Sequence, residues 1–322
     1  MAAWKQEKAE NRAEFLATFA VGLSAEDEPL LEKALDDRAE SVRAIPPGLL
    51  ARIPTSAFAI RMRTRADSML TYADGTLTVK PPTALDKLRE RDGIVAKSPS
   101  SAIGERAWWM LQVMACIPPA YWEQQFGATP NELITAAHTN KWGNPLIEGW
   151  SEAAQLHHET RWIEPLWDWW HQQQGNKKSS GLTTTDMRQT LIILLSAQDA
   201  ERKVQQLFVN ASLSGNADWE EQLEELPKPW STEFGERYLL ELRNYIETLK
   251  PGTRSYPYND SWYQSISIAA RALPPSCFAT ALKPWTLSDN QNWQIAQWQQ
   301  ELDSCMETLR LRQRLIEEIT KK

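Results

Sequence analysis

The sequence predicts an all-α protein of stacked antiparallel helical hairpins, a HEAT-like or α-solenoid-like array. Three observations predict it. The 322 residues include 35 Leu but only 7 Val, and Leu favours helices whereas Val favours strands. Nearly every long segment repeats its apolar residues with a helical period. Proline recurs at the borders of these segments, which indicates many short helices joined by tight corners.

The N-terminal part contains a repeat-like segment. In residues 29–53 the apolar spacing predicts two antiparallel helices around a turn. Asp37 falls at the turn, where it can cap the next helix, and Arg43 can reach back to such a carboxylate. The order Leu-x-x-x-Leu-x-Asp-x-x-x-x-Val-Arg resembles a HEAT-type repeat, although Pro46 and Pro47 stand where that repeat has small helix formers. No second full copy follows, so the sequence does not establish a regular solenoid.

One short stretch departs from the helical pattern. Asp74-Gly75 is a turn signal, and the alternating residues that follow predict a small β-hairpin near residues 76–80. Farther along, residues 107–117 are apolar on almost all sides and include Trp108 and Trp109. Such a helix must be covered on several faces, so we expect it to lie centrally.

An apolar residue followed by two prolines predicts a corner between helices. The pattern occurs at Ile45-Pro46-Pro47, Ile117-Pro118-Pro119 and Leu273-Pro274-Pro275. The residue before Pro is driven out of the α region, whereas Pro fits the first turn of the next helix. The second and third sites are predicted corners; for the first, a kink within one helix is the alternative. The same reasoning predicts corners at Pro165, Pro229 and Pro284.

Capping residues mark further helix starts. Thr129 and Asn144 each precede a proline, which is the N-cap and first-turn combination. The helix opened by Asn144 carries Trp150 on its apolar face, where we expect a structural role. Ser196 and Asp199 resemble a capping box and predict a helix start near residue 197.

The last predicted helix spans residues 290–320. Its seam is apolar at every position except Arg312. The seam residues are Ile295, Trp298, Leu302, Cys305, Leu309, Arg312, Ile316 and Ile319. Such a seam favours side-by-side packing, on a neighbouring helix of the chain or on a partner helix. The predicted parts are a HEAT-like region at 1–100, a Trp-rich region at 101–174 and a C-terminal region at 186–322. The Gly/Lys/Ser/Thr-rich residues 175–185 are the predicted linker.

Tryptophan is the most unusual component, with 16 residues. Trp buries a large apolar area and needs a partner for its N–H group, so most are expected in the core. One segment concentrates four of them, followed by a histidine: Trp162, Trp167, Trp169, Trp170 and His171. One neighbouring helix can hardly cover so wide an aromatic surface. Either this helix is central, or it leaves an exposed aromatic ledge suited to protein binding.

The chain is acidic, with a formal net charge of -7, which opposes general nucleic-acid binding. Residues 38–91 hold ten Lys and Arg against five Asp and Glu, but widening the window to 36–92 adds three Asp. Residues 201–250 hold six Lys and Arg against ten Asp and Glu. Charged faces usually only solvate a helix. The functional interpretation makes Arg61 and Arg65 part of a docking surface for an acidic partner.

No catalytic or phosphate-binding motif occurs in the sequence. Cys116, Cys277 and Cys305 lie far apart, which favours buried free thiols in a reducing compartment. His157 ends its predicted helix and complements the helix dipole better than it would bind a metal. The polar N-terminus and the short apolar runs predict a cytoplasmic protein without a membrane span. We therefore expect no cofactor and no metal.

Several phrases together resemble a bacterial family, domain of unknown function 5691. They are Leu23-Ser24 with Asp27-Glu28-Pro29, Leu35-Asp36-Asp37-Arg38 with Val42-Arg43, Arg91-Asp92-Gly93-Ile94, Gly104-Glu105-Arg106-Ala107-Trp108-Trp109, Ile117-Pro118-Pro119 with Trp122, Gly149-Trp150 with Glu152-Ala153-Ala154, and Leu273-Pro274-Pro275. The resemblance implies no known catalytic residues. It implies genes beside those for MoxR-type AAA ATPases, von Willebrand A-type proteins and SWIM zinc-finger proteins, and hence a part in an ATPase-linked multiprotein system.

Three functional hypotheses follow. The first is a non-catalytic helical-repeat adaptor for protein–protein interaction, with a MoxR-type AAA ATPase or a von Willebrand A-type protein as partner. The second is a HEAT-like nucleic-acid-binding enzyme, which the Arg run and Trp content allow and the net charge opposes. The third is a structural protein that self-assembles through its C-terminal helix.

Overall fold

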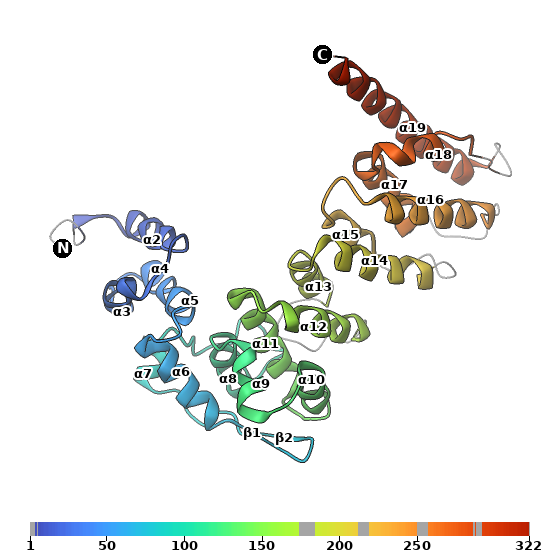
Figure 1. Cartoon of the computed structure of the whole chain (residues 1–322). Coiled ribbons are helices and arrows are strands. Elements are labelled where there is room, and N and C mark those ends of the chain that lie inside the picture. Colours follow the sequence, from blue (N-terminus) through green and yellow to red (C-terminus); the bar gives the residue numbers. More distant parts are fainter. Residues whose placement is uncertain are drawn as a thin grey trace. The chain divides into compact units, whose positions relative to one another are not determined.

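Figure 1 shows the computed structural model of the chain, in which residues 4, 6–173, 184–211, 219–249, 257–285, 287 and 292–321 are described. The chain divides into two compact units, Met1–Leu194 and Leu195–Lys322. Helices dominate both units, and the sheet found among the described residues has two strands. The predicted all-α fold class is confirmed.

The first unit is a succession of short helices. In chain order they are α2 (Ala9–Thr18), η1 (Ala25–Asp27), α3 (Glu28–Ala34), α4 (Glu40–Arg43), α5 (Pro46–Ala51), α6 (Ala57–Asp67), α7 (Lys87–Arg91), α8 (Glu105–Ala115), α9 (Pro119–Phe126), α10 (Pro130–His138), α11 (Gly143–His157), α12 (Thr160–Gln172) and α13 (Thr184–Ile192). The first two proline pairs stand at helix starts, and α4 ends at Arg43 before α5 begins at Pro46, which favours the corner over the kink there.

Residues 29–53 differ from the predicted pair of helices. Three short helices occupy them, α3, α4 and α5. The chain turns at Asp37, and the helical hydrogen bonding is interrupted at Pro46, which has no backbone N–H, although Ile45 keeps helical φ and ψ. Helix α3 packs on α5, and α4 packs on α2. The HEAT-type repeat stays a prediction for this segment.

The predicted hairpin is confirmed. Strands β1 (Leu70–Ala73) and β2 (Thr76–Val79) pair antiparallel, with Leu70 opposite Val79. The turn residues Asp74 and Gly75 both have positive φ, 50° and 73°, which suits a two-residue hairpin loop. The hairpin contacts α6, α9 and α10, which all belong to the first unit.

Helices α8 and α11 form the centre of the first unit. Gly149 of α11 allows the close approach, because a Cβ there would lie 2.8 Å from the carbonyl oxygen of Leu111 and 2.8 Å from Cβ of Met114. Leu111, Met114 and Trp150 are fully buried, so residues 107–117 lie centrally, as predicted. Trp109 is also buried, and its indole N–H donates to the carbonyl of Ala96 at 2.8 Å.

Local capping by a side chain explains several of the helix starts. Thr129 caps α10 in a capping box with Glu132, and the Ser196 hydroxyl accepts from the backbone N–H of Asp199 at 3.1 Å. Both starts were predicted. Asn144 is an exception, since it lies within α11, which begins at Gly143.

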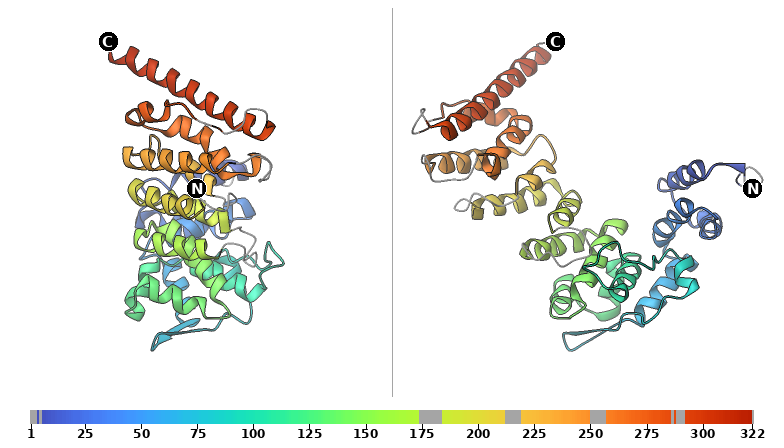
Figure 2. Two further views of the ribbon diagram at one scale, coloured as in Figure 1. Left: turned by 90° about the vertical axis from the view of Figure 1, so that its right-hand side faces the viewer. Right: turned by 180° about the vertical axis from the view of Figure 1, so that it is seen from behind.

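The second unit is also helical. Its elements are α14 (Ala197–Ala211), α15 (Trp219–Glu224), α16 (Thr232–Glu247), η2 (Pro257–Asn259), α17 (Ser261–Ala272), η3 (Pro275–Cys277), α18 (Phe278–Ala281) and α19 (Trp293–Thr320). They lie in successive layers (Figure 2): α14 packs on α16, α15 packs on α17, and α17 packs on α19. Pro274 and Pro275 form the start of η3, which confirms the third proline corner.

Aromatic rings fill the core of the second unit. Trp262 of α17 is fully buried and lies at its centre, with the Trp219 ring centroid 4.8 Å away and the Tyr245 ring stacked at 5.6 Å. Tyr238 is equally buried, and its hydroxyl lies 2.7 Å from the Ser265 hydroxyl. The burial confirms a core role for these Trp residues.

The two units differ from the three predicted parts. Residues 1–100 and 101–174 fall in one unit, because α6 packs on α8 across that predicted border. Helix α13 also packs on α12 and belongs to the first unit. Most of the predicted linker at 175–185 lies outside the described residues.

Candidate recognition surfaces

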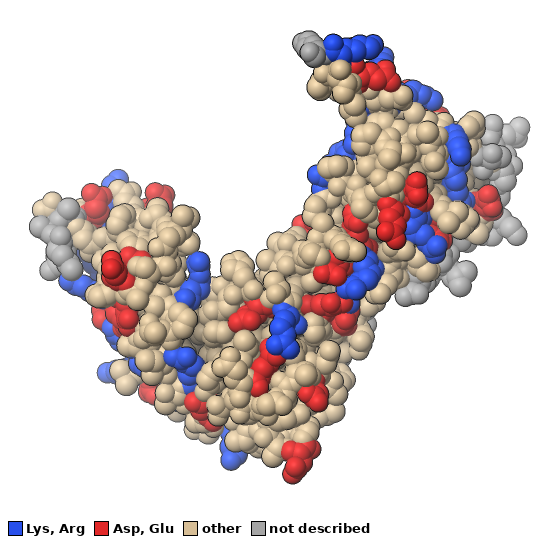
Figure 3. All heavy atoms as spheres, viewed as in Figure 1, with Lys and Arg blue, Asp and Glu red and all other residues tan. Residues whose placement is uncertain are grey.

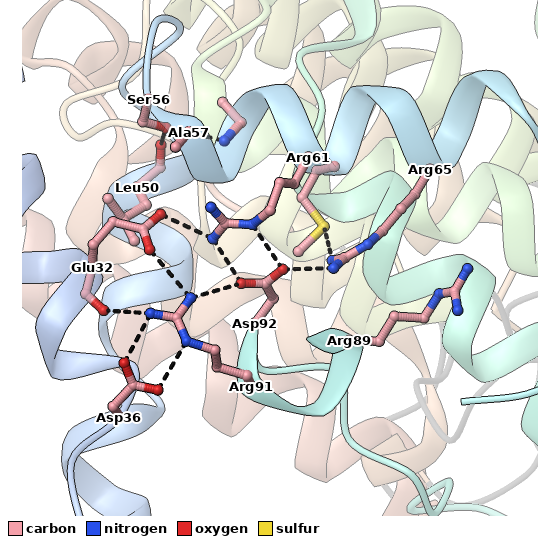
Figure 4. A network of polar contacts seen from close by, with 12 residues as sticks. Glu32, Asp36, Leu50, Ser56, Ala57, Arg61, Arg65, Arg89, Arg91 and Asp92 are labelled. Atoms are coloured by element: carbon pink, nitrogen blue, oxygen red, sulfur yellow. Dashed lines mark hydrogen bonds and ion pairs between the residues drawn. The ribbon is translucent and has the colours of Figure 1, made fainter. Parts of the chain in front are cut away.

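The predicted docking residues Arg61 and Arg65 lie in an internal network (Figure 4). Asp92 follows α7 and has a side chain only 2% exposed. Arg61 donates to both of its carboxylate oxygens, from Nε at 3.0 Å and from Nη2 at 2.7 Å. Arg65 pairs with the same carboxylate at 2.7 Å. The carboxylate therefore balances part of the charge of both arginines and ties α6 to the end of α7.

The network continues to α3 through Arg91. Arg91 donates from Nε and Nη2 to the two carboxylate oxygens of Asp36, at 2.8 and 2.9 Å. Glu32 accepts from Arg61 at 2.9 Å and from Arg91 at 3.3 Å. The hydrogen bond from Arg91 lowers the pKa of Asp36, and the hydrogen bond to Asp36 raises the pKa of Arg91. A docking role for Arg61 and Arg65 stays a prediction, and their observed contacts join three helices.

The predicted contact between Arg43 and the Asp37 carboxylate is replaced by a contact between Arg12 and that carboxylate. The Asp37 carboxylate accepts from Nη2 of Arg12 at 2.7 Å and from the backbone N–H of Ala39 at 2.9 Å. Arg43 donates to the backbone carbonyl of Asp37 at 2.7 Å, and not to its carboxylate. Arg12 was not a candidate, because nothing in the local spacing relates it to Asp37.

The four clustered Trp residues are in the core. Trp162, Trp167, Trp169 and Trp170 are 0 to 6% exposed, so helix α12 is central and the exposed aromatic ledge is wrong. Neighbours from α10, α11 and α13 cover the helix. Pro165 does not open it, because α12 already begins at Thr160.

Polar partners inside the unit hold these rings. The indole N–H of Trp170 donates to the Ser151 hydroxyl at 2.9 Å, and that of Trp162 donates to Glu123 at 2.8 Å. His171 stacks on Trp167 with ring centroids 5.4 Å apart. The segment therefore stabilises the unit from within.

Three titratable groups meet between α8 and α11 and resemble a catalytic set by composition. Burial raises the pKa of the Cys116 thiol to about 12 and that of the Glu152 carboxyl to about 7, whereas it lowers the pKa of His157 to about 4. Nε2 of His157 lies 3.3 Å from the backbone carbonyl of Cys116, and the thiol itself donates to the Gln112 carbonyl. A protonated thiol turned to a carbonyl is a poor nucleophile, so these contacts favour a structural role for the group.

The second unit contains an acidic groove of about 550 Å³. It is lined by Glu220, Glu221, Glu224, Tyr258, Tyr263, Gln264, Ser267, Ile268 and Glu301. Glu224 already pairs with Lys228 at 2.7 Å and with Arg271 at 3.0 Å. Figure 3 shows acidic side chains gathered on the visible face of this unit, with a few basic ones among them.

The groove has a negative electrostatic character. Burial raises the pKa of Glu301, and burial together with the charges of Glu301 and Tyr258 raises the pKa of Tyr263. Sequence reasoning noted the acidic excess of residues 201–250 but missed this site. Its Tyr residues, Tyr258 and Tyr263, lie outside that acidic stretch, and Glu301 comes from a helix that is distant in the sequence.

A second hollow of about 580 Å³ lies between α14 and α16. Its buried carboxylate, Glu201, accepts from the backbone N–H of Ser231 at 2.7 Å and from the Ser231 hydroxyl at 2.6 Å. Ser231 in turn caps α16. The charge of Glu201 is thus used to hold a helix end, and this hollow is a weaker candidate than the acidic groove.

The C-terminal half of α19 is a further exposed surface. The predicted seam is buried at Ile295, Trp298, Leu302 and Leu309, which confirms internal packing over that length. Beyond it four side chains are 38 to 73% exposed: Leu311, Leu315, Ile316 and Ile319. We call these four residues the terminal stripe. Arg312, the polar break in the seam, donates to the carbonyls of Ala270 and Leu273, each at 2.8 Å.

No three His, Cys, Asp or Glu side chains within the described ranges form a group that could hold a metal ion. Among the helices described, none has both the length and the apolar character needed to cross a membrane.

Comparison with known proteins gives one match. A family model described as a family of unknown function, DUF5691, matches residues 1–319. Neither a curated protein nor a solved structure matches the chain.

Proposed function

The chain belongs to DUF5691, a family of unknown function, and on that premise we propose that it is a non-catalytic helical adaptor that binds other proteins. The observation that carries the proposal is the acidic groove of the second unit. Helices α15, α17 and α19 and the short η2 together line it, so a folded unit, and not a single flexible segment, presents it.

The chemistry of the groove suits a positively charged segment of a partner protein. Carboxylates attract Lys and Arg side chains, and a Tyr face adds cation–π attraction. Glu301 and Tyr263 bring both features together in the groove, and Ile268 supplies an apolar contact for the stems of long basic side chains. The acidic excess of residues 201–250 also favours a positively charged partner.

The proposed partner is a component of an ATPase-linked system in the cytoplasm, a MoxR-type AAA ATPase or a von Willebrand A-type protein. The support for this class is the gene association that the family resemblance implies. The nucleic-acid enzyme has less support, because Arg61 and Arg65 are paired with Asp92.

A peptide titration tests the groove. A short fluorescein-labelled peptide rich in Lys and Arg is titrated with the full chain and with two variants, and anisotropy is measured at low and high salt. E301Q removes a charge in the groove, whereas D303N removes a charge two residues away that lies outside it. We expect E301Q to weaken binding about five-fold, as for one partly exposed ion pair, and D303N to leave it unchanged.

Affinity capture from source cells tests the partner. The wild-type chain, E301Q and D303N are used as baits, and AAA ATPases and von Willebrand A-type proteins are quantified by mass spectrometry. The adaptor proposal requires enrichment with the wild type and D303N and a loss with E301Q. Equal recovery with all three baits, or no protein of either class, would refute it.

A further inference from the structure

The terminal stripe lies where α19 has left its supporting helices. Contacts with α17 and α18 bury the helix up to Leu309, and its last turns extend past both helices (Figures 1 and 2). With about 100° per residue, Leu311, Leu315 and Ile319 point within about 40° of one direction. That direction differs from the buried seam, which Ile316 continues, so the other three residues of the stripe form a second apolar face.

We propose that the terminal stripe binds the same stripe of a second copy of this chain, with the two helices antiparallel and Leu315 at the twofold axis. In that register Leu311 lies level with Ile319 of the second copy, and Leu315 meets its own counterpart. Such an isologous contact uses one patch twice, as expected for a twofold dimer. The proposal does not depend on the acidic groove.

The charges beside the stripe select this occupant and this direction. Arg314 and Glu318 lie along one flank of the stripe and form no ion pair with another described residue. With Leu315 on the axis, Arg314 lies within about 3 Å along the axis of Glu318 of the second copy. Symmetry repeats this pair. In Figure 3 basic, acidic and basic side chains follow one another along this end of the helix.

The other direction is less favourable. In a parallel pair with the same residues level, the flank with Arg314 faces the opposite flank of the second helix. Glu318 of the second copy then lies on the far flank from Arg314, and the opposite-charge pair is lost. Antiparallel pairing keeps this pair.

The size of the surface sets the strength of the dimer. The exposed end from 311 to 321 is about 16 Å long at 1.5 Å per residue. Such a contact is smaller than the ~800 Å² per partner of a typical stable interface, so we infer a weak, concentration-dependent dimer.

Sedimentation equilibrium of the full chain tests the proposal from micromolar concentration upward. We expect a monomer–dimer equilibrium that L315D weakens at least ten-fold. Because Leu315 is exposed in the single chain, the variant is expected to keep its circular dichroism spectrum and thermal midpoint. A wild-type chain that is monomeric throughout, or an unchanged constant for L315D, would overturn the proposal and leave the stripe to a different protein.

A charge-swap mixture tests direction and register. R314E and E318R each place like charges together in an antiparallel homodimer, so each alone should dimerise about ten-fold more weakly. Mixed, the two variants restore every opposite pair between chains, and a heterodimer of wild-type strength is expected. If the charge reversals weakened the dimer only by disturbing their own helix, mixing the two variants would not restore association. Failure of the mixture to associate would exclude the antiparallel register.

Discussion

Asp92 shows how one buried carboxylate can organise several residues. It faces Arg61 and Arg65 directly, and Arg91 lies 3.6 Å from it while also holding Asp36 and Glu32. Removing one partner of a buried pair leaves the other charges without compensation, which costs more than the pair contributes. The acceptors of Arg61 and Arg65 come from other helices, so the sequence does not show them. The arginine run therefore looks unpaired in the sequence and suggests a docking surface.

We expect D92N to destabilise the first unit by about 3 kcal/mol, since two guanidinium groups lose their charged acceptor. Urea unfolding followed by circular dichroism measures the loss. R161Q is the matched control, because Arg161 is 72% exposed in its pair with Glu123. It should change the free energy of unfolding by less than about 1 kcal/mol. Equal effects of D92N and R161Q would contradict the role given to Asp92.

Glu152 makes stability depend on pH. Its carboxyl has a pKa of about 7 in the fold against an ordinary value of 4.5, so the folded chain binds the extra proton between these values. The free energy of unfolding therefore falls as pH rises through this window. E152Q removes that fall. Relative to wild type its free energy of unfolding should rise by up to about 3 kcal/mol between pH 4.5 and pH 7.5.

His157 supplies a control of opposite sign. Its pKa of about 4 lies below the ordinary 6.5, so the unfolded chain takes up a proton first on acidification and the fold loses stability between these values. The free energy of unfolding of H157Q should therefore rise relative to that of wild type as pH falls. Urea titrations at several pH values measure both differences, and parallel pH curves for E152Q and wild type would show that Glu152 is not buried as described.

At the scale of elements, helix pairs depend on where two backbones come close. The α8–α11 pair meets at Gly149, whereas nothing lies within 4 Å of a Cβ added at Gly48 of α5. G149A should force the two helices apart and cost about 2 kcal/mol. G48A should be neutral or stabilising by up to about 1 kcal/mol, because Ala favours the helix. Thermal unfolding of both variants gives the comparison; a neutral G149A would mean that the helices can shift without loss.

Sequence reasoning succeeded where the determinants of an element are local. Thr129 with Glu132, Ser196 with Asp199 and the Asp74-Gly75 turn are each specified within four residues. It failed where partners come from other elements. Nothing local pairs Arg12 with Asp37, brings Glu301 beside Tyr263, or shows that α10, α11 and α13 cover the Trp residues of α12. Periodicity gives the apolar face of a helix but not the helix that will cover it.

At the scale of the whole molecule, each of the two units has its own core. Trp150 and Leu111 lie in the first, and Trp262 and Tyr238 lie in the second. Substitutions in one core should therefore act mainly on that unit. We expect G149A to accelerate amide hydrogen exchange in residues 1–194 and to leave residues 195–322 within about two-fold of wild type.

Hydrogen exchange with mass spectrometry measures both ranges in one sample. The reverse test replaces Leu302, which is fully buried in the second unit. L302A should accelerate exchange in residues 195–322 only. Uniform acceleration over the chain in either variant would mean that the units unfold as one cooperative body.

The buried indole rings also give the molecule an optical property. Trp169 and Trp170 have centroids 4.9 Å apart in one unit, and Trp219 and Trp262 have centroids 4.8 Å apart in the other. Buried indole rings this close share their electronic excitation. Each unit thus carries an intrinsic chromophore pair, and its tertiary order can be followed in the near ultraviolet without an added dye.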